Sequence, residues 1–267
     1  MMGRGFFCVA ICAATTAFGQ SPFIVVQSTT STANSGLYDA ILPQFEAISG
    51  IEARVVAVGT GQALKNAANC DGDVLLVHAR TAEEAFVAQG YGVARFDVMY
   101  NDFVLVGPSD DPAGVAGTTD ARAALAQVAT VQAVFVSRGD DSGTHKAELR
   151  LWAQVPDAAS DSWYRELGAG MGATLNAAVA MGAYTLTDRA TWLSFGNRAA
   201  HRVVVEGDPA LFNQYGVIAV SPEHCPRVKA AEAQAFVAWI LGAAGQAAIA
   251  GFRLNDTQLF FPNAGAQ

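Results

Sequence analysis

The chain has 267 residues, of which 52% are hydrophobic, and its formal net charge is −8. This length and hydrophobic content allow one large or two moderate globular domains and exclude an intrinsically disordered polypeptide. The negative charge, together with the absence of any lysine or arginine run, argues against a nucleic acid or an acidic membrane as the partner.

The first residues have the pattern of a cleaved secretory signal peptide. One positive residue, Arg4, precedes a short apolar segment, and Ala17 and Gly19 are the small residues expected just before a cut at Gln20. The apolar segment is too short for a lasting transmembrane anchor. Its two cysteines follow large residues instead of the small ones that precede a lipid-modified cysteine. We therefore expect removal of residues 1–19 and a soluble periplasmic protein.

Two cysteines, Cys70 and Cys225, remain after export into an oxidising compartment. They can form one disulfide or stay as two separate thiols, and the sequence leaves both possibilities open. Their separation and their different neighbours do not match the ligand spacing of a zinc site, so we expect no metal centre.

The first half of the chain alternates β-rich runs with helical patterns. Strands are predicted at 24–27, 51–58 and 73–77, and the last of these is typical of a strand buried on both faces of a parallel sheet. A helix is predicted after each strand, at 37–48, 62–69 and 81–89. This alternation indicates an α/β fold.

A second α/β unit follows a turn-rich segment. Two more β-rich runs, 96–100 and 103–106, lead into 107–114, which we interpret as a crossing between two lobes. The apolar strand 215–220 is interpreted as the return crossing, followed by a helical segment that packs back on the first lobe. The predicted organisation is a signal peptide at 1–19, a first lobe at 20–106, a second lobe at 107–213 and a return segment of the first lobe at 214–267.

Three junctions between a strand and the following helix carry hydroxyl residues and glycine. They lie at Ser28–Thr32, Gly59–Gly61 and Ser137–Thr144, where strands deliver their carboxyl ends, the edge at which ligands bind in open α/β sheets. Helix starts leave backbone N–H groups unpaired and carry partial positive charge. With Arg138 as the charged donor, the junctions predict a shell of donors around one small anion between the lobes. The net charge does not oppose this, because short-range Coulomb interactions outweigh a diffuse, salt-screened charge.

The sequence closely resembles the tungstate-binding, TupA-like substrate-binding components of ABC transporters over nearly its whole exported length. The residues that carry the resemblance are Ser28–Thr32, Val58–Leu64, Asp73–His78, Met99–Phe103, Gly107–Pro108, Ser137–His145, Gly170–Gly172 and Tyr184–Arg189. The resemblance implies an α/β type II periplasmic binding protein, in which two α/β lobes are joined by two hinge crossings with the ligand cleft between them. It also implies delivery of an oxyanion to an ABC permease and its ATPase. We expect a monomer with no cofactor and no catalytic residue.

The resemblance also implies which residues bind tungstate, or the closely similar molybdate. They are Thr29, Thr30, Ser31, Thr32, Thr60, Gly61, Arg138, Ser142, Gly143 and Thr144. The family usually has threonine where this chain has Ser28, and serine keeps the hydroxyl donor. Tungstate and molybdate are nearly equal in size, charge and shape, so only the family likeness ranks them.

The segment Arg138–Thr144 also resembles the phosphate-binding proteins of the same fold, which makes phosphate or sulfate the alternative ligand. Phosphate near neutral pH keeps a proton and needs an acceptor carboxylate, whereas tungstate and molybdate are unprotonated dianions that a carboxylate repels. His78 stands where phosphate binders place their acceptor aspartate, and Asp140 is expected to orient the Arg138 guanidinium. Both features favour the fully deprotonated oxyanion.

A hydrolase that uses Ser142 and His145 is a further alternative. A catalytic triad needs three groups that converge in space, and a single short loop containing these two residues and Asp140 rarely provides that. The Gly170–Gly172 loop and the Asp188–Arg189 pair stay open between ligand contact and a structural role in packing, capping or ion pairing.

Overall fold

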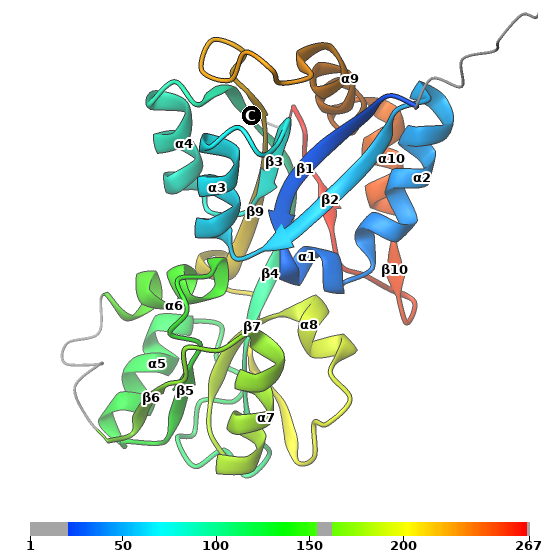
Figure 1. Cartoon of the computed structure of the whole chain (residues 1–267). Helices are drawn as coiled ribbons and strands as arrows, with labels where there is room; N and C mark the ends of the chain where they lie inside the picture. The colour runs from blue at the N-terminus through cyan, green and yellow to red at the C-terminus, as the bar shows by residue number, and fades with distance from the viewer. Residues whose placement is uncertain (1–20, 154–161, 266–267) are drawn as a thin grey trace, which may run out of the picture.

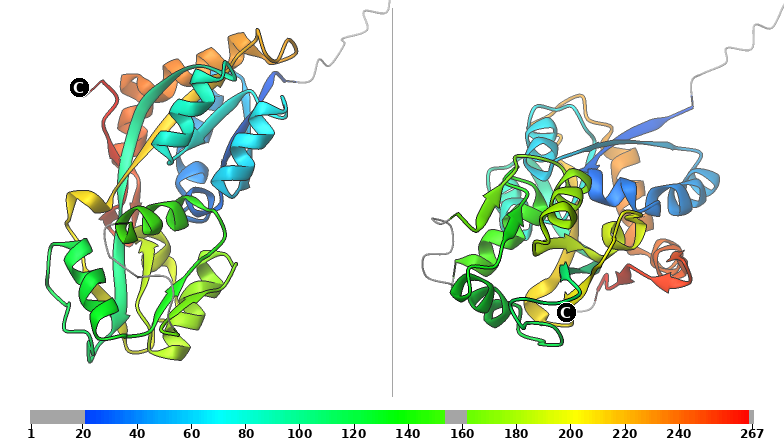
Figure 2. Two further views of the ribbon diagram at one scale, coloured as in Figure 1. Left: turned by 90° about the vertical axis from the view of Figure 1, so that its left-hand side faces the viewer. Right: turned by 90° about the horizontal axis from the view of Figure 1, so that it is seen from below.

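A computed structural model describes residues 21–153 and 162–265. The predicted signal peptide and its cut before Gln20 lie outside these residues. Two groups of elements, here called the first and second lobes, are stacked one on the other and joined by long strands (Figures 1 and 2).

The first lobe is built on a mixed sheet. Its strands are β1 (Phe23–Thr29), β2 (Glu52–Val58), β3 (Val74–Val77), the first part of β4 (Gly92–Pro108), β9 (Phe212–Val220) and β12 (Phe261–Pro262), in the order β12-β4-β9-β3-β1-β2. β1 pairs in parallel with β2 and β3, whereas β9 is antiparallel to β3 and β4. Because β1, β2 and β3 are parallel, their carboxyl ends lie at one edge of the sheet.

Helices cover both faces of this sheet (Figure 1). They are α1 (Thr30–Asn34), α2 (Leu37–Ser49), α3 (Thr60–Ala68), α4 (Arg80–Ala88), α9 (Ala230–Leu241) and α10 (Ala243–Gly251). On the α2 and α9 side, Phe45 packs edge-on against Phe236 with ring centroids 5.1 Å apart. Among the described residues, no single helix is long and apolar enough to cross a membrane. Only α9 and α10 together reach that length, and they are bent by 59° and bury residues in the core.

The second lobe has shorter strands. It contains α5 (Ala121–Thr130), β5 (Phe135–Ser137), α6 (Gly143–Trp152), β6 (Tyr164–Glu166), α7 (Met171–Met181), β7 (Thr185–Asp188), α8 (Arg189–Ser194), β8 (His201–Val205) and the 3-10 turn η1 (Pro209–Leu211). β7 and β8 pair antiparallel with the last part of β4, while β5 and β6 pair in parallel. An aromatic core forms around Phe135, whose ring centroid lies 5.0 Å from that of Trp152 and 5.8 Å from that of Tyr164.

β4 is one strand of 17 residues, where the sequence predicted two runs followed by a crossing at 107–114. Its first part pairs with β9 as far as Asp102, and from Phe103 it pairs with β7. The strand therefore crosses near Asp102, and the turn-rich segment lies in the second lobe, where Ala113 enters the core. We propose Asp102 and Phe212 as the places where the chain passes between the lobes.

Two other local features differ from the sequence prediction. The hydroxyl-rich residues after β1 form the short helix α1, not a loop. α2 then begins after Gly36, which adopts a positive φ of 80°. A small hairpin of β10 (Arg253–Leu254) and β11 (Thr257–Gln258) near the end of the chain was also not predicted, because strands of two residues carry no periodicity.

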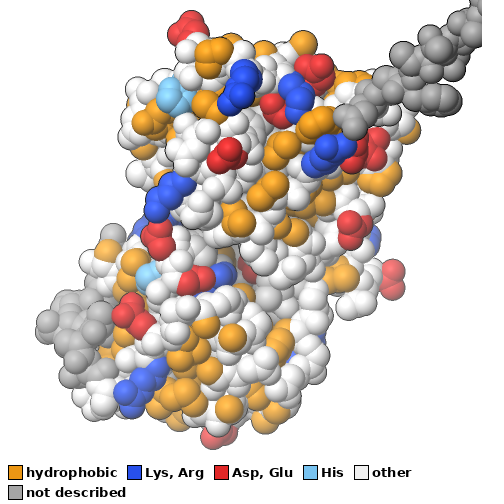
Figure 3. Space-filling view, viewed as in Figure 1, with side chains coloured by type: hydrophobic (Ala, Val, Ile, Leu, Met, Phe, Trp, Pro, Cys, Tyr) orange, Lys and Arg blue, Asp and Glu red, His pale blue; other side chains and the backbone are white. Residues whose placement is uncertain are grey.

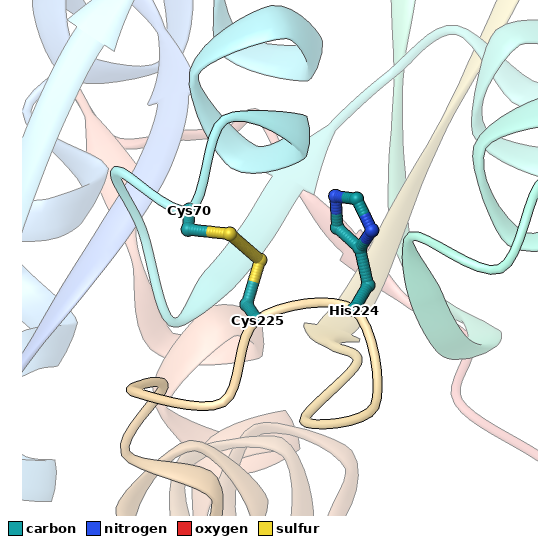
Figure 4. Close-up of side chains that lie close together, drawn as sticks. All are labelled: Cys70, His224 and Cys225. Carbon is teal, nitrogen blue, oxygen red and sulfur yellow. A yellow bond between two sulfur atoms is a disulfide. The ribbon is translucent and has the colours of Figure 1, made fainter.

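Cys70 and Cys225 form a disulfide that links the end of α3 to the loop between β9 and α9 (Figure 4). The His224 ring lies beside it, with Nε2 2.8 Å from the carbonyl oxygen of Ala68. A reduced pair of cysteines would place two thiols near this imidazole. The disulfide removes both thiolates, so this cluster does not form a thiolate metal site in the oxidised protein.

The disulfide is expected to contribute substantially to stability. It joins residues 155 positions apart, so its removal frees a long loop in the unfolded chain. The double substitution C70A/C225A should lower the free energy of unfolding by about 2–5 kcal/mol. Urea denaturation of both proteins measures this, and an unchanged free energy would contradict it. Dithiothreitol should destabilise the wild type and leave the double variant unchanged.

Candidate functional site

A cavity of about 400 Å³ lies between the lobes at the carboxyl edge of the β1–β3 sheet. It is lined by Thr29, Thr30, Ser31, Asn34, Val58, Gly59, Thr60 and His78 of the first lobe, and by Arg138, Asp140, Ser142, Gly143, Thr144, Gly170, Met171, Gly172, Thr191, Ser194 and Phe195 of the second. The starts of α1, α3, α6 and α7 all reach it, so several positive helix ends surround one space. Figure 3 shows charged side chains of both signs near the boundary between the lobes.

The cavity brings together most of the predicted ligand residues: Thr29, Thr30, Ser31, Thr60, Arg138, Ser142, Gly143 and Thr144. Thr32 and Gly61 are not among its lining residues. The buried Thr32 hydroxyl lies 2.7 Å from that of Thr29 and 3.5 Å from that of Tyr215, so it supports the loop from behind. Gly61 faces the second lobe, because a Cβ built on it would lie 2.8 Å from a carboxylate oxygen of Asp141.

Ser28, at the start of the predicted hydroxyl loop, also lies behind the cavity. Its hydroxyl donates to the carbonyl oxygen of Leu76 at 2.7 Å and hydrogen-bonds to the Tyr38 hydroxyl. Gly59 has a φ of −67°, so the glycines of the second junction are not required for a positive φ. At Gly61 the two lobes approach so closely that a larger side chain would collide with Asp141, which explains the glycine there.

Two of the residues that line the cavity, one from each lobe, are threonines whose hydroxyls are buried. Thr60 begins α3, and Thr144 is the second residue of α6. Both Oγ1 atoms are buried and have no hydrogen-bond partner among the described residues. A buried hydroxyl left unsatisfied costs about 1–3 kcal/mol. Because both residues line the same cavity, a ligand that accepts two hydrogen bonds can satisfy both.

The start of α6 supplies further donors. The Ser142 hydroxyl caps the helix by accepting the N–H of His145 at 3.2 Å, and the Ser142 N–H donates to Oδ1 of Asp140 at 3.2 Å. Among the described residues, no acceptor bonds the N–H groups of Gly143 and Thr144. These two backbone donors are therefore available at the cavity.

Arg138 is held by its neighbour Asp140. Its Nε and Nη2 lie 3.2 and 2.5 Å from Oδ2 of Asp140, and its Nη1 makes no hydrogen bond to the described residues. Burial raises the pKa of Asp140, but hydrogen bonds from Ser142 and the charge of Arg138 outweigh that effect and hold the pKa below its ordinary value. Asp140 therefore stays ionised and orients the guanidinium, as the sequence predicted for its role.

His78 forms part of the cavity wall as a neutral ring. Its Nδ1 lies 3.0 Å from Oδ1 of Asn213, and its Nε2 lies 3.5 Å from the Ser31 hydroxyl. Its pKa is lowered to about 4, mainly by burial and further by the charge of Arg138, while the hydrogen bond to Asn213 opposes the shift. Across the gap, a Cβ at Gly143 would lie 2.4 Å from Cε1 of His78, so the two lobes touch here.

The two segments that the sequence left open differ in their positions. Gly170–Gly172 lines the cavity, whereas Asp188 and Arg189 do not. Asp188 caps α8 by accepting from the Thr191 N–H at 2.8 Å, and its burial raises its pKa. Arg189 forms ion pairs with Asp102 at 2.5 Å and Glu206 at 2.7 Å, next to the crossing of β4.

Sequence reasoning missed Asn34, the α8 residues Thr191 and Ser194, and Phe195, which directly follows α8. Thr191 and Ser194 are three positions apart, so they share a face of the helix that Asp188 caps. That spacing of hydroxyls is the signal that could have found them.

The hydrolase alternative does not match the geometry. The Ser142 hydroxyl bonds the backbone N–H of His145, not its ring. Nδ1 of that ring accepts the N–H of Asp141 at 3.0 Å, and Nε2 lies 3.8 Å from a carboxylate oxygen of Glu166. In this arrangement neither ring nitrogen hydrogen-bonds the serine hydroxyl, as a catalytic base would have to.

Neutral burial of His78 predicts a pH dependence of stability. Between pH 6.5 and about 4 the unfolded chain binds a proton that the native state excludes, so this residue lowers the free energy of unfolding as the pH falls, by at most about 1.4 kcal/mol per pH unit. His78→Gln should lose that contribution. Urea denaturation at pH 7 and pH 5 should therefore show a smaller drop for the variant. Glu83 and Glu148, whose pKa values burial raises to about 7, also titrate in this range, but they do so in both proteins and cancel in the comparison. An equal change in the free energy of unfolding for the wild type and the variant would contradict the prediction.

Comparison with known proteins assigns the family. A model described as PBP superfamily domain matches residues 13–244. The tungstate-binding protein TupA of Peptoclostridium acidaminophilum is 48% identical over 245 residues, which cover 90% of this chain and 86% of its own length. The structure of the tungstate-binding protein TupA from Desulfovibrio alaskensis G20 is 50% identical, covers 91% of this chain and 100% of its own, and has a TM-score of 0.83. The structure described as the tungstate ABC transporter from Geobacter sulfurreducens is 45% identical, covers 86% of this chain and 98% of its own, and has a TM-score of 0.79. The chain therefore belongs to the TupA family of periplasmic binding proteins, with their two-lobed α/β fold.

Proposed function

We propose that this protein captures one tetrahedral oxyanion outside the cytoplasm, tungstate before molybdate, and delivers it to the permease and ATPase of an ABC transporter. The observation that carries the proposal is the pair of buried hydroxyls, Thr60 and Thr144, which line one cavity from opposite lobes without a partner. A tetrahedral dianion directs acceptor oxygens outward in several directions and can accept from both lobes at once. The tungstate-binding relatives named above support the choice of tungstate.

The charges around the cavity favour an unprotonated ligand. Arg138 and Asp140 are the charged side chains among the described lining residues, and they are paired with each other. Asp140 accepts from the guanidinium through one oxygen and from the Ser142 N–H through the other, and its pKa is lowered. It is therefore poorly suited to accept the proton of a phosphate. Hydroxyls, helix starts and the remaining guanidinium nitrogen instead suit a ligand that only accepts hydrogen bonds.

Binding is proposed to bring the two lobes together, with no reaction catalysed on the ligand. The cavity is completed by the two lobes of one chain, so a monomer suffices for the receptor. The ion satisfies donors on both lobes, and this differential contact favours the closed arrangement over an open one. The position of the Ser142 hydroxyl as a helix cap supports a binding role instead of a nucleophilic one.

Isothermal titration calorimetry with tungstate, molybdate, sulfate and phosphate tests the proposed function. One saturable site for tungstate is expected, with weaker binding of phosphate because no free carboxylate receives its proton. Absence of saturable binding for all four anions would exclude the receptor function. Phosphate binding more tightly than tungstate would favour the alternative ligand.

The same titration applied to Thr60→Val and Thr144→Val tests whether the two buried hydroxyls bind the oxyanion. Each substitution keeps the shape but removes one hydroxyl from a hydrogen bond to a charged ligand, worth about 1.5–3 kcal/mol. Tungstate should therefore bind roughly 10- to 100-fold more weakly to each variant. Thr130→Val on the exposed face of α5 is the matched control and should retain wild-type affinity. Wild-type affinity in both cavity variants would refute the shared donor shell.

Gly143→Ala tests closure separately from donor chemistry. The added methyl group would lie 2.4 Å from Cε1 of His78, so the lobes have to separate although every donor remains. We expect tungstate affinity to fall by about tenfold or more, as for other overpacked contacts. Gly172→Ala is the control, because a Cβ there meets no atom within 4 Å. Calorimetry provides the affinities, and equal effects of the two substitutions would argue against the contact as a condition of closure.

A further inference from the structure

A second cavity lies between the lobes on the side of the crossing strands. Its volume is about 750 Å³, larger than that of the oxyanion cavity. The first lobe contributes the start of α4, the second lobe contributes α6, and β4 and β9 close it at the crossing. His78 and Gly143 line both cavities, so their contact forms the wall between the two spaces.

The charged side chains that line this second cavity are all cationic. Its described lining residues include Arg80, Lys146 and Arg150 and no aspartate or glutamate. Arg80 and Lys146 pair with carboxylates outside the cavity. Arg150 has no carboxylate partner among the described residues, and its Nη2 lies 3.4 Å from the carbonyl oxygen of Ala210. Arg150 is solvent-exposed, and partial desolvation together with the nearby charge of Arg122 lowers its pKa.

The inner surface of the cavity is apolar. Phe103 lines it with a buried side chain, and Phe212 lines it while remaining 53% exposed. Ala82, Ala85 and Ala147 supply small side chains that leave the space open. A small tetrahedral ion gains nothing from these aromatic and aliphatic walls. A cavity of this volume, mostly apolar with a few charged groups, is typical of a site for an organic small molecule.

We propose that this second cavity binds an amphipathic organic anion, with an aromatic or aliphatic body against Phe103 and Phe212 and a carboxylate or sulfonate near Arg150. Because both lobes form its walls, such a ligand contacts the closed arrangement more extensively than an open one. Its binding is then coupled to oxyanion binding, and the coupling is reciprocal. The site itself stands independently of the proposed function, whereas the coupling rests on it.

Fluorescence titration with 8-anilinonaphthalene-1-sulfonate tests the site, because this anionic dye emits strongly once its rings leave water. One saturable site is expected on the folded protein without any oxyanion present. Arg150→Glu should weaken dye binding by about tenfold through charge reversal. Ala85→Trp should weaken it by occupying the space. Arg227→Glu makes the same charge change at an exposed position outside the cavity and should have no effect.

The dye titration distinguishes a failure of the second binding site from a failure of the proposed oxyanion binding. No saturable dye binding, or binding that both cavity variants leave unchanged, would overturn the proposal. Circular dichroism of each variant identifies loss of fold, and the exposed position of Ala85 leaves at least one variant with an intact core. Saturating tungstate should tighten dye binding. If tungstate binds but dye affinity does not change, the coupling is refuted; if tungstate does not bind, the dye titration still decides the second site.

Discussion

The structure depends on donors that each lobe buries but cannot satisfy alone. Within residues 21–153 and 162–265, the hydroxyls of Thr60 on the first lobe and Thr144 on the second have no hydrogen-bond partner, and neither do the N–H groups of Gly143 and Thr144. Polar groups withdrawn from water without partners destabilise a closed cavity. A ligand rich in acceptors removes that penalty, so binding and closure become one event.

Buried hydrogen bonds hold these donors in position. Under the second-lobe loop, Glu148 accepts from the Ser137 hydroxyl at 2.9 Å and from the Tyr164 hydroxyl at 2.7 Å. In the first lobe, the Thr32 hydroxyl links helix α1 to Tyr215 on β9. None of these residues lines the cavity, but their hydrogen bonds connect the segments that do to the neighbouring strands. The residues proposed to bind the oxyanion are thereby held in position without it.

Much of the architecture could be predicted from local patterns, and the exceptions have physical causes. The strand 73–77 and the junction at Gly59–Gly61 were evident because apolar runs and glycine-hydroxyl junctions are local signals, although α3 begins at Thr60 and not at residue 62 as predicted. β4 was not evident as one strand, because Asp102 interrupts the apolar pattern. Its carboxylate pairs with Arg189, 87 residues later, which no local pattern reveals. Only the packing shows that Thr32 lies behind Thr29 and that Gly61 faces Asp141 of the second lobe, so that neither residue lines the cavity.

The position of the bound ion is the most direct test of a donor shell shared by the two lobes. Crystals grown with tungstate, with diffraction recorded at a tungsten absorption edge, locate the metal independently of the protein atoms. We predict one strong anomalous peak between the lobes, with oxyanion oxygens about 2.7–2.8 Å from the hydroxyls of both Thr60 and Thr144. A peak outside that cavity, or one within reach of a single lobe only, would contradict the shared donor shell.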